Sequence, residues 1–545
     1  MSSFPLPPRP GPEEAAVFGR RSLLVGAGVG AAFLALGQLT GARPAAATPS
    51  GRGLFGLGIA SGDPDHESVV LWTRLVPDPM NGGGMGPAPV RVEWRVATDP
   101  SMRRVVRRGA ERASADQAHS VHAVVDDLEC DRDYWYQFRA RGELSGIGHA
   151  RLLPEPSSRP PSMAFAVANC QDLQNGYWPG YAAMAVEDLD FVLHVGDYIY
   201  EYDPASAFAD RRHTTPEAPG LDQLRTLADY RNRHAQYKTD PQLQAAHAAH
   251  AFFVVPDDHE VENNYANLVD EVDDKGAQLQ DPAAFALQRA AAYQAYYEHM
   301  PLRPSSRPTG PDIQLYRGFR FGRLAEVSLL DTRQYRTDQP GGVPTDFGPP
   351  FLGDTNAAGT LTGDAQEAWL LDRLRRRRAR WNIIAQQTMV ARTQFAVPNV
   401  GRLLNLDQWD GYGPFRARLL GQLAASGASN PVVISGDIHS SWVNDLKVDF
   451  ADPASPVVAT EFVSTSLSSD FPANFVPLVI GSNAALNPHV KYFDGTRHGY
   501  IRATVTTDEW RSDFRTSATI ATRDAPVATS ASWVVENGRP GAHPA

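Results

Sequence analysis

Thiol, phenol, imidazole and carboxylate side chains follow four short apolar segments of this chain. The apolar segments are residues 163–168, 191–195, 252–255 and 431–435. The polar side chains that follow them are Cys170, Asp197 with Tyr200, Asp258 with His259, and Asp437 with His439. Side chains of these types are ligands for iron, zinc and calcium. A single polar side chain after an apolar segment is common in turns, but four such positions in one chain favour a single metal centre.

Short apolar segments bounded by Gly, Pro and Asp are typical of buried strands. In α/β folds, ligands bind in the loops after the carboxyl ends of strands, because those loops project side chains without disturbing the sheet. The sequence therefore predicts that these strands present their polar side chains to a common site. Between residues 155 and 523 such strands alternate with helical or loop segments, including an expected helix at 366–374, which indicates an α/β or α+β domain.

Residues 50–154 have a different pattern. Short alternating runs at 68–72, 90–97, 120–125 and 134–140 are separated by Gly, Pro and Asp, which predicts a small all-β sandwich. Leu128 and Tyr134 have the spacing of a tyrosine corner, a feature of immunoglobulin-like or fibronectin-like sandwiches. Proline occupies four of the eight positions at 154–161, which indicates a linker. Residues 524–545 are small and polar, and we expect a loosely ordered tail there.

The first 47 residues have the features of an export signal. Arg20 and Arg21 precede a Gly- and Ala-rich apolar stretch that runs to Leu39, and residues 44–47 offer a small-residue cleavage site. This pattern resembles a twin-arginine signal, so we expect the twin-arginine export machinery as a partner and a secreted or extracytoplasmic location, in the periplasm or cell wall. A membrane anchor is the alternative, but an apolar stretch interrupted by Gly is a weak span.

Composition and charge narrow the range of functions. The chain has two cysteines, Cys130 and Cys170, so it is not a disulfide scaffold, and a single bridge between them is an alternative to two free thiols. Its formal net charge is −11, and the sequence shows no basic footprint for nucleic acid. The arginines at 375–378 follow the expected helix 366–374 and complement its dipole. Affinity for a phosphate group would therefore have to be local, and a metal cluster can supply it.

Several motifs occur in one order along the chain. They are SGDP and VVLWTRL near the start, GDYIYEY at 196–202, PDDHEVENNY at 256–265, LDTRQYR at 330–336, SGDIHSSW at 435–442 and NPHVKYF at 487–493. With these motifs the chain resembles the PhoD-type alkaline phosphatases and phosphodiesterases, within the calcineurin-like and purple acid phosphatase group of metallophosphoesterases. The resemblance covers nearly the whole chain after the signal. It implies two packed mixed β-sheets flanked by helices, preceded here by the β-sandwich.

The resemblance also implies a role for each predicted ligand. The residues that would bind a ferric ion (Fe³⁺) are Cys170, Asp197, Tyr200 and His439. Asp197 would bridge to a second site, where Asp258 and Asp437 would hold one or more calcium ions (Ca²⁺), because hard oxygen ligands suit calcium.

Some positions leave alternatives open. Purple acid phosphatases have Asp where this chain has Cys170, and His where it has Asp437, so the second site favours calcium over zinc. Asp257 is the alternative to Asp258 as a ligand. Gln386 and Gln387 follow a strand comparable to one that carries a ligand in that group, but we assign them no role.

The predicted reaction is hydrolysis of phosphate esters. A metal pair neutralises phosphate oxygens and lowers the pKa of a bound water, which supplies hydroxide for in-line attack near neutral pH. His259 is the predicted catalytic residue that protonates the leaving alkoxide, and orientation of a carboxylate is its alternative role. Arg333, which follows the apolar run 325–330, is a weaker prediction for contact with the substrate phosphate, and surface pairing is its alternative role.

The leading interpretation is thus an exported alkaline phosphatase or phosphodiesterase. A secreted phospholipase D of the same family, acting on phospholipids, is one alternative. A non-catalytic cell-surface binding protein with structural metals is an alternative of another class. Structural metal sites are closed, whereas catalytic sites keep an open position for water. Six or seven ligands shared by two or more metals leave positions open, which favours the enzyme.

Overall fold

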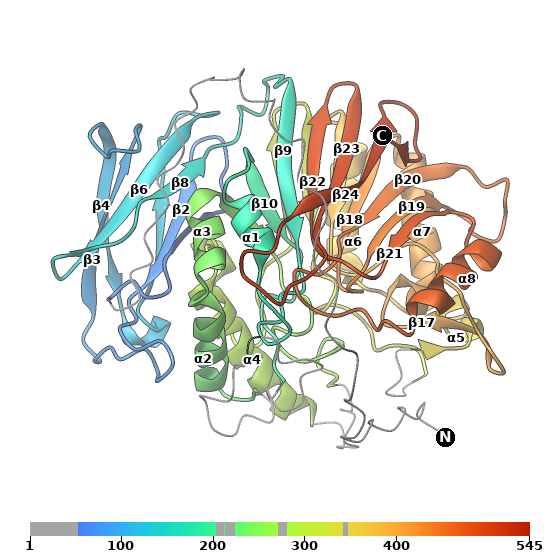
Figure 1. The fold of residues 1–545 in the computed structure, drawn as a ribbon, viewed down its shortest axis with the longest axis horizontal. Coiled ribbons are helices and arrows are strands. Elements are labelled where there is room, and N and C mark those ends of the chain that lie inside the picture. The colour runs from blue at the N-terminus through green and yellow to red at the C-terminus, as the bar shows by residue number, and fades with distance from the viewer. Residues whose placement is uncertain (1–52, 203–211, 213–223, 271–280, 342–346) are drawn as a thin grey trace, which may run out of the picture. The chain divides into compact units, whose positions relative to one another are not determined.

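Two mixed β-sheets with helices on their outer faces make up most of the chain (Figure 1). The computed structural model describes residues 53–202, 212, 224–270, 281–341 and 347–545. The expected export signal at 1–47 lies outside the described residues. Among the helices in the described ranges, none has both the length and the apolar character needed to cross a membrane.

The first sheet has ten strands in the order β25–β24–β23–β22–β9–β10–β11–β1–β2–β5. Their bounds are β1 (Ile59–Gly62), β2 (Val69–Arg74), β5 (Ser120–Val125), β9 (Ser162–Ala168), β10 (Phe191–His194), β11 (Ala251–Val254), β22 (His498–Thr506), β23 (Glu509–Ser517), β24 (Ala528–Glu536) and β25 (His543–Pro544). Strands β9, β10 and β11 are parallel neighbours, and Ala168, His194 and Val254 are level in the register. Three of the predicted strands therefore end together at one edge.

The second sheet has seven strands in the order β12–β13–β15–β18–β20–β19–β21. Their bounds are β12 (Arg317–Phe321), β13 (Ala325–Leu329), β15 (Trp381–Ala385), β18 (Pro431–Ser435), β19 (Ser441–Lys447), β20 (Val457–Val463) and β21 (Val490–Asp494). Strands β13, β15, β18 and β20 run parallel in the middle of this sheet. The fourth predicted strand, at 431–435, is β18.

Side chains alternate between the two faces of each strand, and this alternation explains how the sheets and helices form layers. In β9, Phe165 and Val167 point to a core shared with the second sheet, where they meet residues such as Ile383 and Ile434. Ala166 and Ala168 point to the other face, because successive side chains of a strand alternate. The structure therefore has helix, sheet, sheet and helix layers, and the expected pair of packed mixed sheets flanked by helices is confirmed.

Helices pack on the outer face of each sheet. Those on the first sheet are α1 (Pro179–Met184), α2 (Leu227–Lys238), α3 (Pro241–Ala249) and α4 (Pro282–His299). Those that follow β13 in the chain are α5 (Pro350–Asp354), α6 (Gly363–Arg375), α7 (Gly413–Ser426) and α8 (Val476–Leu486). Helix α6 confirms the helix expected at 366–374. A small sheet of β14 (Phe347–Gly348), β16 (Phe395–Val397) and β17 (Gly401–Asn405) lies in the same part of the chain.

The N-terminal β region consists of two packed sheets, but one of them is shared. Its own sheet contains β3 (Val90–Ala97), β4 (Val105–Ala113), β6 (Asp133–Ala140), β7 (Glu143–Leu144) and β8 (Gly148–Arg151). This sheet packs through an apolar core on β1, β2 and β5, and β1 in turn pairs with β11 of the ten-stranded sheet. The Tyr134 hydroxyl accepts a hydrogen bond from the Glu129 amide at 2.8 Å, as a tyrosine corner would. The immunoglobulin-like or fibronectin-like class stays a prediction.

One expectation needs correction. Residues 524–545 are not a loosely ordered tail, because β24 pairs along its length with β23 and places Trp533 and Val535 in the core between the sheets. Of the two alternatives for the cysteines, the structure has two free thiols, with Cys130 exposed and Cys170 buried.

Candidate metal centre

The predicted ligands come from four strand ends and meet in the folded chain. Cys170 follows β9, Asp197 follows β10, Asp258 follows β11, and Asp437 follows β18. The first three strands are neighbours in the ten-stranded sheet, whereas β18 belongs to the seven-stranded sheet. The carboxyl edges of both sheets therefore contribute to one site.

The backbone is strained at these strand ends. The φ angles are +52° at Cys170, +57° at Asp197, +66° at Asp437 and +52° at His439. Residues other than glycine rarely adopt this left-handed region, at a cost of roughly 1–3 kcal/mol each. At the neighbouring Gly196 a Cβ would lie 2.4 Å from the Cβ of Asp257, so the two loops approach too closely for a side chain. Such strain is typical of functional sites, where it aims side chains at a ligand.

A thiol, a phenol and an imidazole surround one carboxylate on one side of the site. Oδ2 of Asp197 lies 3.3 Å from Sγ of Cys170 and 3.0 Å from Oη of Tyr200. Nε2 of His439 lies 3.2 Å from the same phenol oxygen. The ligand atoms of Cys170, Asp197 and His439 all lie within 4.8 Å of one another. One ion can therefore contact all of these side chains.

Four carboxylates form the other side. Asp197, Asp257, Asp258 and Asp437 each place an oxygen within 4.8 Å of the others. Three buried oxygens, Oδ1 of Asp197, Oδ2 of Asp257 and Oδ1 of Asp258, have no hydrogen-bond partner among the described residues. Buried carboxylates without partners are strongly unfavourable, and hard oxygen donors suit a divalent cation. The donor set thus fits metal ions, and Asp197 belongs to both sides.

Burial favours the neutral forms of these groups. It raises the pKa of the Cys170 thiol and of the Tyr200 phenol well above their ordinary values, and the nearby Asp197 charge adds to both shifts. Burial likewise raises the pKa of Asp197, and it raises the pKa of Asp437 to about 6. Burial lowers the pKa of His439 to about 4, so its imidazole is neutral at pH 7 and able to bind a metal.

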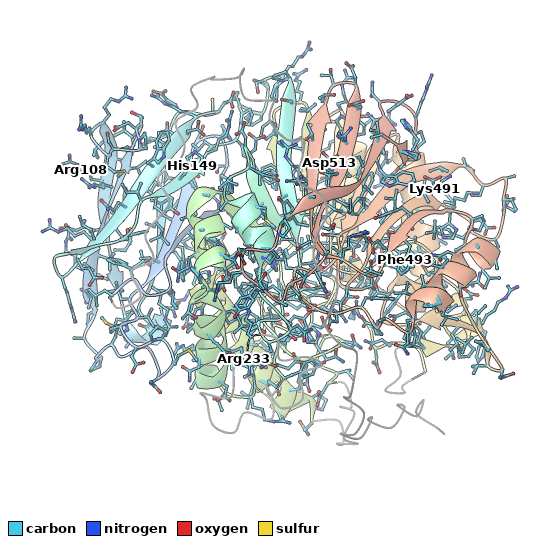
Figure 2. All side chains as sticks on the ribbon, in the orientation of Figure 1. Arg108, His149, Arg233, Lys491, Phe493 and Asp513 are labelled. Atoms are coloured by element: carbon cyan, nitrogen blue, oxygen red, sulfur yellow. The ribbon has the colours of Figure 1, made fainter. Side chains whose placement is uncertain are left out.

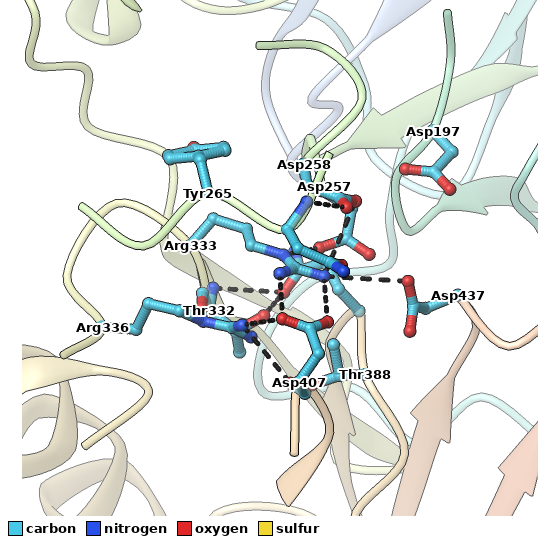
Figure 3. A network of polar contacts seen from close by, with 12 residues as sticks. Asp197, Asp257, Asp258, Tyr265, Thr332, Arg333, Arg336, Thr388, Asp407 and Asp437 are labelled. Carbon is cyan, nitrogen blue, oxygen red and sulfur yellow. Dashed lines mark hydrogen bonds and ion pairs between the residues drawn. The ribbon is translucent and has the colours of Figure 1, made fainter. Parts of the chain in front are cut away.

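Arg333 lies in the middle of the carboxylates (Figure 3). Its guanidinium makes two hydrogen bonds to Asp407, at 2.7 and 2.8 Å, and its Nε donates to Asp257. Nη2 also lies 3.6 Å from Asp258 and 3.7 Å from Asp437. The side chain is 0% exposed. This position disfavours the expected contact with a substrate phosphate, because the charge is enclosed by carboxylates of the protein.

His259 lies beside Glu201 and Tyr200. Its Nδ1 is 2.7 Å from Oε2 of Glu201, and its ring stacks on that of Tyr200 with centroids 4.1 Å apart. Burial opposes the charged imidazolium, but Glu201 and Asp258 outweigh this effect and raise the pKa of His259 well above its ordinary value. His259 therefore carries a proton that it can donate at neutral pH.

A pocket of ≈ 270 Å³ opens next to these groups. Asp258, His259, Asp437 and His439 line one part of it. The apolar side chains of Phe347, Met389, Phe395, Trp442, Phe471 and Phe475 line another. A small molecule in this pocket would contact both the candidate ligands and an apolar wall.

Comparison with known proteins shows the family of this chain. A family model described as "PhoD-like phosphatase" matches residues 165–514, and one described as "PhoD-like phosphatase, N-terminal domain" matches residues 41–154. The chain belongs to the PhoD-like phosphatase family. It is 44% identical over 534 residues to alkaline phosphatase D of Bacillus subtilis (strain 168), which covers 96% of this chain and 88% of that protein. A solved structure described as "Structure of PhoD" matches with a TM-score of 0.83 and 44% identity, over 90% of this chain and 92% of that one.

Membership of the PhoD-like phosphatase family confirms the expected resemblance. This PhoD-like chain is a phosphoric ester hydrolase, and its clustered Cys, Asp and His side chains are groups that can hold the metal ions of such an enzyme.

Two residues that organise this PhoD-like site were not found from the sequence. Glu260 accepts hydrogen bonds from the backbone amides of Asp197 at 3.2 Å, Tyr198 at 2.6 Å and Asp257 at 2.9 Å, so it ties the loop after β10 to the loop after β11. Its place in the run DDHE was a signal for it. Asp407 pairs with Arg333 from a loop after β17, and no sequence pattern marks it.

Asp257 and Asp258, the two alternatives for one ligand, both belong to the carboxylate group. Each has one oxygen that accepts a hydrogen bond, from Arg333 and from the Asn264 amide respectively, and one oxygen with no hydrogen-bond partner among the described residues. Gln387 accepts from Thr332 at 2.6 Å, and Gln386 donates to Ser435 at 2.8 Å. The two glutamines therefore connect strand ends of the second sheet.

Proposed function

We propose that this chain is an exported alkaline phosphatase or phosphodiesterase whose active site is the metal centre described above. The observation that carries this proposal is that a thiol, a phenol, an imidazole and three further carboxylates gather around Asp197. In this proposal the signal at 1–47 directs export through the twin-arginine machinery to the periplasm or cell wall. Residues 50–154 form an immunoglobulin-like or fibronectin-like domain, residues 155–523 form the catalytic domain, and residues 524–545 complete its first sheet.

The two sides of the site would hold different ions. The ferric ion would be held by Cys170, Asp197, Tyr200 and His439, whose thiolate and phenolate forms suit Fe³⁺. Asp197, Asp258 and Asp437 would hold Ca²⁺ through carboxylate oxygens. When bound, such ions neutralise phosphate oxygens and lower the pKa of the water that attacks phosphorus.

The side chains of the protein supply the remaining steps. His259 donates its proton to the leaving alkoxide, and Glu201 holds the imidazole in place through Nδ1 so that Nε2 is free to act. Arg333 does not contact substrate in this proposal. It fixes Asp257 and Asp407 and offsets the negative charge of the carboxylate group.

Replacing His259 by Ala should slow esters with poor leaving groups far more than esters with good ones. A proton donor matters most when the leaving alkoxide is strongly basic, and general acid catalysis contributes about 10²–10⁴-fold. The measurement is kcat for a series of aryl and alkyl phosphate esters. Equal losses across the series would assign His259 to orientation of a carboxylate instead.

Replacing Tyr200 by Phe should bleach a visible absorption band of the purified protein. Ferric phenolate gives a charge-transfer colour, and Tyr200 is the phenol in contact with Asp197 and His439. The checks are the visible spectrum and the iron content of both proteins. Tyr202→Phe is the matched control and should keep the colour. A colourless, iron-free and fully active wild type would contradict the ferric ion.

The apolar wall of the pocket favours a second candidate, a phospholipase D. A phosphate ester that carries an apolar group would place that group against residues such as Trp442 and Phe471. In this case the substrate is a phospholipid rather than a soluble ester.

Three substrates compared side by side test the proposal: a nitrophenyl phosphomonoester, the matching nitrophenyl phosphodiester, and phosphatidylcholine. We expect the calcium-supplied enzyme to hydrolyse the simple esters, with their ratio giving its preference. Dominant release of choline would move the assignment to phospholipase D. If the metal-loaded protein hydrolyses none of the three substrates, both candidate functions are contradicted.

A further inference from the structure

A fifth strand end reaches the metal centre, from β20 of the second sheet. Strand β20 runs parallel to β18, with Val463 level with Ser435, and is followed by residues 464–470, which read STSLSSD. We call residues 464–470 the serine segment. Its serines and its threonine are each 0–2% exposed, although segments that only connect strands run over the surface. Buried hydroxyl groups are unfavourable unless they make hydrogen bonds, so their partners indicate what the serine segment does.

Three of the four predicted iron ligands contact the serine segment. The hydroxyl oxygen of Ser469 lies 2.7 Å from the phenol oxygen of Tyr200. The carbonyl oxygen of Asp470 lies 3.2 Å from Nδ1 of His439. The carbonyl oxygen of Cys170 accepts a hydrogen bond from the Ser469 amide at 3.3 Å. One segment therefore holds side chains or backbone of ligands that come from three different strand ends.

The protons of this network have defined positions. The hydroxyl of Tyr200 has one proton, which it donates to Oδ2 of Asp197 at 3.0 Å, so Ser469 is the donor in the 2.7 Å contact. A carbonyl oxygen can only accept, so Nδ1 of His439 donates to Asp470 and Nε2 keeps its lone pair for a metal. A cation that binds Tyr200 replaces the phenol proton, and the phenol oxygen can still accept from Ser469.

The position of Tyr200 does not depend on Ser469. The Tyr200 amide donates to the hydroxyl of Tyr237 at 3.1 Å, and its carbonyl oxygen accepts from Arg233 of α2, which Figure 2 labels. The ring of Tyr200 stacks on that of His259, with centroids 4.1 Å apart. The backbone and the ring are thus fixed by other residues. The hydroxyl of Ser469 therefore acts on the phenol oxygen itself.

We propose that Ser469 is a positioning residue of the metal centre, whose hydroxyl lowers the electron density that the Tyr200 oxygen donates to the ferric ion. A hydrogen bond to a ligand oxygen engages one of its lone pairs, and such bonds tune the reduction potential of a metal. With Ser469 in place, the ion is more electron-poor and polarises phosphate oxygens more strongly. The inference rests on the proposed function, because it takes the ferric ion as bound to Tyr200.

The test uses variants of the metal-loaded full chain. Ser469→Ala and Ser469→Gly remove the donor, and Ser469→Thr keeps it. Ser468→Ala is the matched control, because the Ser468 hydroxyl is also buried but bonds to the Asp172 carbonyl at 2.6 Å and to Nε1 of Trp178 at 3.0 Å. The measurements are iron content, the visible spectrum, and the reduction potential from a redox titration of the visible band. Hydrolysis of a nitrophenyl phosphomonoester and of the matching diester is measured in parallel.

We expect Ser469→Ala and Ser469→Gly to lower the ratio of ferrous to ferric protein about tenfold at a given potential, which is a potential about 59 mV lower for one electron. The phenolate band should move to longer wavelength, because the phenolate has become a stronger donor, and kcat should fall about tenfold. Ser469→Thr should restore the band and the potential of wild type. Ser468→Ala should keep both, although its melting temperature falls.

A wild-type band and potential in the donor-free variants would overturn the inference even if their activity fell, because a merely structural hydroxyl leaves the ion unchanged. Equal shifts in Ser469→Ala and Ser468→Ala would also overturn it. An iron-free wild type that hydrolyses the esters would overturn the inference and leave the phosphatase function standing. A wild type that hydrolyses neither ester, but shows the expected shift on loss of the Ser469 hydroxyl, would contradict the proposed function and support the role of Ser469.

Discussion

Replacing Arg333 by Met should lower the free energy of unfolding by about 3–5 kcal/mol, because it removes one partner from a buried ion-pair network. Arg333 is fully buried, and its guanidinium bonds to Asp407 and Asp257 while lying within 4 Å of Asp258 and Asp437. Without it, four buried carboxylates lose their shared cation. The measurement is urea unfolding of wild type and variant under identical metal conditions.

The same change should lower activity by about 10–100-fold, as for other residues that orient metal ligands. Arg333→Lys should recover only part of the loss, since an ammonium cannot reproduce the two-pronged contact with Asp407. Arg74→Met is the matched control, because Arg74 is also buried and contacts the Ala118 carbonyl and His299, none of which lines the pocket. That control should lose stability but keep its activity per folded molecule. A stable Arg333→Met enzyme with only a raised KM would instead support the sequence-based expectation that Arg333 contacts substrate.

The four strand ends were predictable because each one has a local signature. An apolar run of four to six residues, then Asn, Gly or Pro, then a metal ligand within the next two residues predicts both the strand and the position of its side chain. The observed bounds of β9, β10, β11 and β18 differ from the expected ones by one residue at most. Parallel register then brings the side chains after β9, β10 and β11 together without any further information.

The organising residues were not predictable in the same way. Asp407 reaches Arg333 across 74 positions of the sequence, and its role depends only on how the loop after β17 packs. Glu260 stands in the run DDHE, but it acts through backbone amides of Asp197 and Tyr198, and the run does not show which amides it meets. Arg333 followed an apolar run like the other predicted site residues, but its burial depends on the loops that cover it. Long-range packing therefore decided what each of these side chains does.

Composition is a poor guide to the structure of the C-terminus. Residues 524–545 are small and polar, yet Ala528–Glu536 extends the first sheet as β24. Ser and Thr on the exposed half of that strand lower its apolar content, and only Trp533, Val534 and Val535 are buried. A strand that is half exposed near the edge of a sheet has too few apolar residues to be recognised without its partner strands.

After the metals are removed, the free energy of unfolding should fall as the pH rises from about 4 to 8. Burial raises the pKa of Asp197, of Asp257 and, to about 6, of Asp437. A carboxyl group with a raised folded-state pKa gives its full stability below the unfolded pKa, and this contribution is lost as the pH rises through the folded pKa. For Asp437 the window runs from 3.8 to about 6 and corresponds to roughly 3 kcal/mol. Arg333 and His259 outweigh burial and hold the pKa of Asp258 low, so Asp258 changes stability only below this window.

Chelated and metal-loaded protein should therefore respond differently to pH. Bound cations favour the ionised carboxylates, so the loaded protein should keep its melting temperature up to pH 8, whereas the chelated protein should lose several degrees. Asp437→Asn should reduce the loss in the chelated protein, because one of the repelling charges is gone. Asp190→Asn is the control: burial also raises the pKa of Asp190 to about 6, but Asp190 precedes β10 at the opposite end of the strand. The effect of Asp190→Asn on the melting temperature should be the same with and without metals. A chelated protein whose stability rises with pH would mean that the carboxylates are not held together in the absence of cations.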